Sequence, residues 1–222
     1  MRPLLRLLIV LLLSLCLSAP PASAFDTILS DESIREAYFL GQRHDGTVPR
    51  LLDKYTRHLP PPHSGPHISS IAFFTPFVQL ALFSDGYIGN YSAQQARLDH
   101  RGRQDFVKIF VHIHLTDSYG RFMENPAHGT SASSPPLIRR PYDFWKDFRL
   151  QVFSDHQLLQ PSSFQGTAES ACGRRGGPCI LTGAMIEIEL LAESFNSDSA
   201  TILVAPPEGD PVSVEFDLTS LR

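Results

Sequence analysis

Hydrophobic and polar residues alternate most regularly in the segment 107–115, "VKIFVHIHL". Every odd-numbered position in this segment is aliphatic, whereas the even positions carry a lysine, a phenylalanine and two histidines. A period of two is the pattern of a β-strand, because successive side chains point to opposite faces of a sheet. The segment therefore predicts a strand whose odd-numbered face lies in the core.

The last third of the chain repeats this kind of pattern in shorter pieces. In "AMIEIELLA" (184–192) glutamates alternate with aliphatic residues, and "ATILVAP" and "VSVEFDL" follow at short spacing, separated by "PPEGDP". "HISSIAFFTPF" and "FRLQVFS", earlier in the chain, also read as strands. Several short strands separated by Pro, Gly and Asp turns are typical of an antiparallel sandwich or barrel.

Helical spacing dominates the first third instead. Ser30 precedes two acidic residues and a helical repeat that ends at "HDG", so we expect a capped helix after it. Further helices are expected in "VPRLLDKYTRHL" (48–59) and after Ser92, and "FVQLALFS" (77–84) fits either a helix or a buried strand. The fold class expected is α+β and β-dominated: an antiparallel β-sandwich in 66–222 with a helical N-terminal segment in 25–65.

The first 24 residues have the pattern of a signal peptide. Arg2 and Arg6 precede an apolar run that is short for a membrane span, and Ala22-Ser23-Ala24 fits the cleavage rule. All 23 acidic residues but only 17 of the 19 basic residues lie beyond this segment, which gives the mature chain a formal charge of −6. We therefore expect an exported, periplasmic or extracellular protein, with no transmembrane segment in the mature chain and no nucleic-acid partner.

Two cysteines follow the predicted signal peptide, Cys172 and Cys179, in "CGRRGGPC". An even number of cysteines in an exported chain predicts a disulfide. A redox-active pair is the alternative, but such pairs favour C-x-x-C at a helix N-terminus, whereas this pair lies between expected strands. We expect a structural disulfide.

The strongest candidate chemistry is the pair His112 and His114 on the polar face of the strand in 107–115. On a strand their Cα atoms are about 6.6 Å apart, which allows both imidazoles to bind one zinc ion. A third ligand is not evident: Asp117 and Glu124 follow the strand, and His100 and His128 lie outside expected strands. The bland alternative is two polar residues on a solvated sheet face, since nine histidines produce such a pair readily by chance.

The most aromatic stretch is "RRPYDFWKDF" (139–148), which contains Tyr142 and the single tryptophan, Trp145. Exposed rings of this kind can stack on a carbohydrate or anchor a protein partner. The structural interpretation is that Trp145 and Phe148 cover the core where the chain re-enters the sheet. Both remain open from the sequence, and we favour the second.

Motifs of other chemistries are missing from the sequence, including G-x-S-x-G, a P-loop, G-x-G-x-x-G after a strand and H-E-x-x-H. We therefore expect an exported soluble protein that is non-catalytic and has a binding or structural role with an unknown protein or carbohydrate partner. The first alternative is a metal-binding protein or zinc-dependent enzyme that uses His112 and His114. The second is a carbohydrate- or protein-binding module with an aromatic surface around Trp145 and Tyr142.

Overall fold

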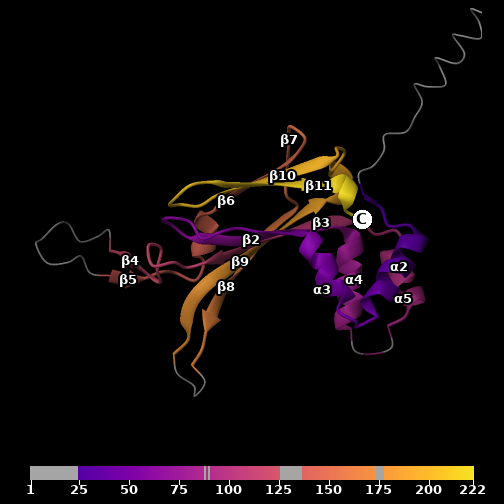
Figure 1. Cartoon of the computed structure of the whole chain (residues 1–222), viewed down its shortest axis with the longest axis horizontal. Helices are drawn as coiled ribbons and strands as arrows, with labels where there is room; N and C mark the ends of the chain where they lie inside the picture. Colours follow the sequence, from indigo (N-terminus) through magenta and orange to yellow (C-terminus); the bar gives the residue numbers. More distant parts are fainter. Residues whose placement is uncertain (1–24, 88, 90, 126–136, 174–177) are drawn as a thin grey trace, which may run out of the picture.

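The computed structural model describes residues 25–87, 89, 91–125, 137–173 and 178–222. The predicted signal peptide, 1–24, lies outside these residues. Figure 1 shows two stacked sheets, with the helices α2–α5 gathered at one end of them. The fold class expected from the sequence, α+β with a dominant antiparallel β component and an N-terminal helical segment, is confirmed.

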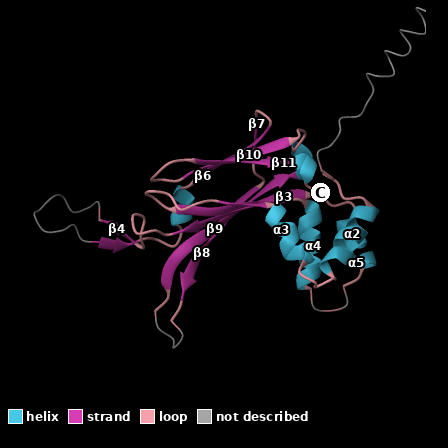
Figure 2. Ribbon diagram, in the orientation of Figure 1, coloured by secondary structure: helices cyan, strands magenta, loops and turns pink. Residues whose placement is uncertain are grey.

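Two antiparallel sheets form the β layer. The larger has the order β1-β2-β3-β9-β8: Thr56–His58 (β1), His67–Phe74 (β2), Phe106–His114 (β3), Ile180–Leu191 (β9) and Ser163–Ala171 (β8). The smaller has the order β11-β10-β6-β7: Val212–Asp217 (β11), Ser199–Ala205 (β10), Arg149–Ser154 (β6) and Gln157–Leu159 (β7). A separate hairpin of β4 (Phe122–Glu124) and β5 (Leu137–Arg139) projects away from the helical end (Figure 2).

The core lies between the two sheets. Phe73 on β2 faces Phe216 on β11 with a ring-centroid distance of 5.4 Å, and it also contacts Phe195. The aliphatic positions 107, 109, 111 and 113 of β3 are completely buried, whereas the intervening side chains stay partly exposed. The alternation in "VKIFVHIHL" thus identified the inner face correctly.

The helices begin where the sequence supplies caps. In α2 (Asp31–Gly41) the Ser30 hydroxyl accepts a hydrogen bond from the Ser33 amide, and Ser92 caps α5 (Ala93–His100) in the same way. The segment that fitted either a helix or a strand is helical, α4 (Pro76–Gly86). The Thr75 hydroxyl caps it, and a proline suits its first turn because that position needs no amide donor.

The expected helix over 48–59 is partly wrong. Helix α3 spans Thr47–Lys54, and the chain then enters the sheet as β1. Tyr55, expected on the helix, is buried below it and exchanges hydrogen bonds with the backbone of Arg222. Pairing of β1 with β2 in register therefore wins over continued helical spacing.

Strands β7 and β8 had no counterpart among the sequence predictions. The sequence of β8, "SFQGTAESA", is made mostly of small and polar residues. It forms the edge of the larger sheet and pairs with β9 along its whole length. Among the described residues, no helix is long and apolar enough to cross a membrane.

Candidate functional site

A groove lies where the helical end meets the outer face of the larger sheet. Helix α4 directly follows β2 and α5 shortly precedes β3. Because β2 and β3 are antiparallel neighbours, the end of one strand and the start of the other bring both helices to the same edge of the sheet. The Gln79 amide on α4 fixes this corner, since it donates to the carbonyls of Phe74 (2.9 Å) and Phe106 (2.8 Å).

Two cavities of about 550 Å³ and 430 Å³ form this groove. Both are lined by Gln79, His100, Arg103 and Lys108, so they adjoin along these four side chains. Each volume lies in the range of roughly 300–1,000 Å³ that is usual for small-molecule sites. We call the whole the α4–β3 groove.

The larger cavity is the polar end of the α4–β3 groove. Lys108 donates to Glu187 (2.7 Å) and also contacts Glu189 (2.8 Å), its cross-strand partner on β9. Partial burial opposes the charge of Lys108, but the two carboxylates outweigh it and raise the pKa of the ammonium group. Lys108 is therefore held as a fixed positive charge between two negative ones.

A second polar pair stands at the same end. His100 Nδ1 lies 3.5 Å from Asp105 Oδ1, and Asp105 also accepts from the Leu29 amide. Arg103 beside them donates to the carbonyl of Asp99 rather than to a carboxylate. This end of the groove thus offers both donors and acceptors.

The smaller cavity is the aromatic end of the α4–β3 groove. Phe74 and Phe110 lie on neighbouring strands with ring centroids 5.2 Å apart, and Phe83 and Tyr91 meet edge-to-face at 5.0 Å. Burial is the main cause of a raised pKa at Tyr91, and nearby Asp99 adds to it. Phe83 is half exposed, so part of this aromatic wall faces solvent.

The two predicted zinc ligands lie on the same face of β3, beyond Phe110. His112 Nδ1 is 3.7 Å from Glu169, and the ring of His114 lies 6.1 Å from that of His67, its cross-strand partner on β2. His67 is itself hydrogen-bonded to the Leu59 carbonyl. Within the described ranges, no group of three or more His, Cys, Asp or Glu side chains is placed to hold a metal ion.

The aromatic stretch 139–148 divides between two environments. Trp145 packs on Gly166 and Phe164 of β8 and contacts the core, whereas Tyr142 is half exposed. Phe148 is buried. This packing favours the structural interpretation of Trp145.

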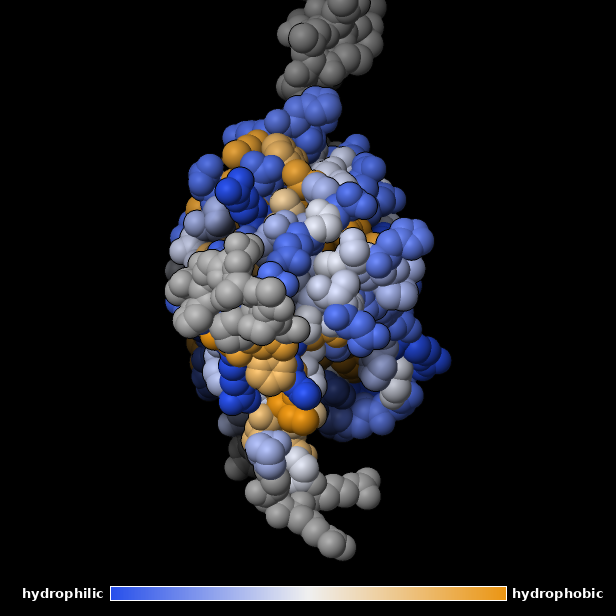
Figure 3. All heavy atoms as spheres, turned by 90° about the vertical axis from the view of Figure 1, so that its left-hand side faces the viewer, coloured by the Kyte–Doolittle hydropathy of each residue, from blue (hydrophilic) through white to orange (hydrophobic). Residues whose placement is uncertain are grey.

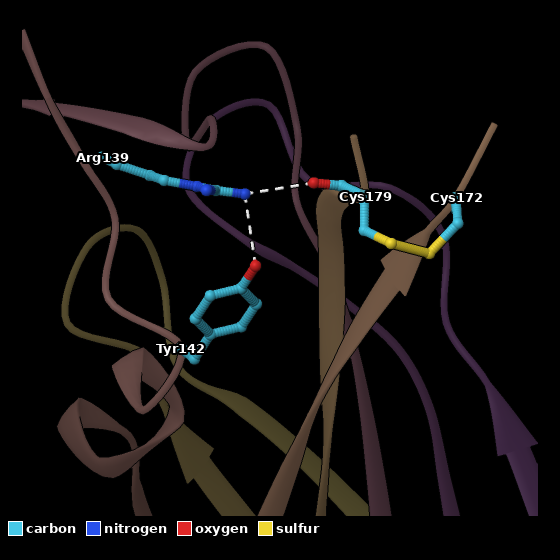
Figure 4. The surroundings of a disulfide bond; sticks show 4 residues. All are labelled: Arg139, Tyr142, Cys172 and Cys179. Carbon is cyan, nitrogen blue, oxygen red and sulfur yellow. Dashed lines mark hydrogen bonds between the residues drawn. A yellow bond between two sulfur atoms is a disulfide. The ribbon is translucent and has the colours of Figure 1, made fainter. Parts of the chain in front are cut away.

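The disulfide between Cys172 and Cys179 is formed, as predicted, and links the facing ends of β8 and β9. Figure 4 shows Arg139 of β5 reaching this link: its guanidinium donates to the Cys179 carbonyl (3.1 Å) and to the Tyr142 hydroxyl (3.2 Å). The disulfide therefore lies beside the β4–β5 hairpin.

An exposed apolar patch accompanies that hairpin. Its members are the exposed side chains of Phe122, Leu137, Ile138 and Ile180. Figure 3, which views the molecule from this side, shows hydrophobic surface gathered on the lower half of the face. In contrast to the α4–β3 groove, the patch adjoins residues outside the described ranges.

Sequence reasoning missed the α4–β3 groove. Its residues come from four elements, and none of them forms a motif with its neighbours in sequence. The available signals were Thr75-Pro76, which marks a helix start after β2, and the even-numbered positions 108 and 110 of the opening strand. No protein-family model matches the chain, and no curated protein is significantly similar to it in sequence.

Proposed function

We propose that the protein is an exported, soluble, non-catalytic binding protein and that its ligand occupies the α4–β3 groove. Export is supported by the signal-peptide pattern in 1–24. It is also supported by the disulfide, because disulfides persist mainly in oxidising compartments outside the cytosol.

The observation that carries the proposal is the adjoining of two cavities, one aromatic and one polar, along shared side chains. Small-molecule sites combine apolar walls, which supply binding energy, with a few polar groups, which fix the orientation. Gln79, Arg103 and Lys108 lie at the junction, where they reach a ligand that extends into either cavity.

The state of Lys108 supports binding rather than covalent catalysis. A lysine that acts as nucleophile or base needs a lowered pKa, so that its amine is neutral near pH 7. In this protein the ion pairs with Glu187 and Glu189 raise the pKa of Lys108 instead. The lysine therefore serves as a hydrogen-bond donor and a fixed charge.

The test uses 8-anilinonaphthalene-1-sulfonate, a fluorescent probe with aromatic rings and a polar head. Phe83→Ser removes a half-exposed ring from the groove, and Phe122→Ser removes a ring of similar exposure from the β4–β5 hairpin as a matched control. We expect the groove variant to bind the probe about tenfold more weakly, since a phenyl contact contributes about 1–2 kcal/mol. Loss of binding in the control alone, or in neither variant, contradicts the proposal.

The zinc hypothesis for His112 and His114 and the aromatic-surface hypothesis for Tyr142 and Trp145 stay predictions. The structure adds His67 opposite His114, a third imidazole on the same sheet face. It also adds the packing of Trp145 on Gly166.

A further inference from the structure

The aromatic end of the α4–β3 groove presents rings from both the sheet and a helix. Phe74 and Phe110 extend from the sheet, and Phe83 extends from α4. The face of an aromatic ring carries partial negative charge and attracts C–H groups, which bear partial positive charge. A pyranose ring offers a flat face of C–H groups, so it fits such a wall better than a charged group does.

The polar end offers donors and acceptors side by side. Arg103 and Lys108 donate, and Asp105 and Glu189 accept. A sugar hydroxyl both donates and accepts, and therefore uses both kinds of partner. Because the cations stand among carboxylates, the wall favours a neutral ligand over an anionic or a cationic polymer.

The position of the groove disfavours an extended peptide. Peptides of that kind bind by adding a strand to an open sheet edge. The groove lies over β3, the central strand of its sheet, whose backbone is paired with β2 on one side and β9 on the other. Ligand recognition in the groove must therefore come from side chains.

A long acyl chain is disfavoured by the larger cavity. Its lining includes His100, Arg103, Asp105, Lys108 and Glu189, and burying these groups against hydrocarbon would leave them without partners. The apolar lining is confined to the smaller cavity, so the groove suits a ligand that is polar throughout and has apolar faces.

Resting on the proposed function, we propose that the ligand of the α4–β3 groove is a neutral oligosaccharide. One sugar unit stacks on the rings of Phe83 and Phe110, and the next places its hydroxyls against Arg103, Lys108 and Glu189. The ligand then runs along the groove from its aromatic to its polar end.

The experiment titrates the purified protein with four hexasaccharides: cellohexaose, xylohexaose, chitohexaose and maltohexaose. Calorimetry measures the affinity for each, and the fluorescent probe is then competed against the tightest binder. We expect at least one hexasaccharide to bind and to displace the probe. Phe83→Ala and Arg103→Ala should each weaken that binding by at least about tenfold, whereas Phe122→Ala should leave it unchanged.

The outcomes separate this inference from the proposed function. If none of the four sugars binds while the probe still requires Phe83, the groove is a ligand site and the oligosaccharide inference is wrong. If the probe does not require Phe83 either, both fail. Phe83 and Arg103 are exposed, so their variants should fold, and thermal unfolding of each variant confirms this.

Discussion

Gly166 lies directly beneath the indole of Trp145: a Cβ atom added to the glycine would come within 2.4 Å of the ring. The glycine is on the inner face of β8, opposite the buried Ile186 of β9. The tryptophan thus closes the side of the sandwich, in a space that exists only because the strand has no side chain at this position.

Gly166→Ala should therefore destabilise the fold. We expect a loss of about 1–3 kcal/mol in the free energy of unfolding, because the added methyl group displaces the indole. Denaturant unfolding measures it, and iodide should quench Trp145 more strongly in the variant. Gly86→Ala is the matched control, since a Cβ there meets no atom within 4 Å. Equal stability of the parent and Gly166→Ala would show that Trp145 is not packed in this way.

Tyr55→Phe should cost about 1–2 kcal/mol of stability. The buried hydroxyl accepts from the Arg222 amide (2.9 Å), and its removal leaves that backbone donor without its partner. Tyr142→Phe removes a half-exposed hydroxyl and should change stability by less than about 0.5 kcal/mol. Chemical denaturation of both variants compares them, and similar costs would contradict the role given to Tyr55.

Removing the disulfide should lower stability without changing the fold. Cys172 and Cys179 are separated by 7 positions, and closing so small a loop contributes about 2.5 kcal/mol by chain entropy. The Cys172→Ser/Cys179→Ser double variant should therefore melt at a lower temperature yet retain its circular dichroism spectrum. A reductant should lower the melting temperature of the parent only. A collapse of the spectrum in the double variant would mean that the link holds the core itself.

Lys108→Met should destabilise the protein in a pH-dependent manner. The folded-state pKa of Lys108 is raised above 10.5, so its ion pairs contribute fully below that value and are lost as pH rises through the folded pKa. We expect a cost of about 1 kcal/mol that stays constant from neutral pH to about pH 9. Above pH 10.5 the difference from the parent should shrink. A difference that grows with pH in this alkaline range would contradict the assignment.

Zinc should not bind stoichiometrically to His112 and His114. The rings of His67 and His114 are 6.1 Å apart, and His67 is hydrogen-bonded to the Leu59 carbonyl. Metal analysis of protein purified without chelators provides the measurement. One zinc per chain, lost in the His112→Ala/His114→Ala double variant, would establish the metal hypothesis instead.

The sheet was predictable where each strand has one buried face. In β3 the buried and exposed positions alternate without a break, so the sequence alone identifies the inner side. Helices α2 and α5 were predictable because Ser30 and Ser92 cap them. Such signals are local, and they depend on one element at a time.

The remaining features depend on contacts between elements. Helix α4 is apolar on nearly all sides because the core surrounds it, so its period could not separate helix from strand. Strand β8 is an edge strand rich in small residues, and Gly166 makes sense only with Trp145 above it. The α4–β3 groove joins Phe83 of a helix to Lys108 of a strand, a pairing that no sequence spacing reveals.

The most direct test of the central claim is an amide NMR titration of the protein with 8-anilinonaphthalene-1-sulfonate. Our account predicts that the largest shift changes fall on Gln79, Arg103 and Lys108, at the junction of the two cavities. Changes confined to Phe122 and Ile138 of the β4–β5 hairpin, with the groove amides unmoved, would contradict it.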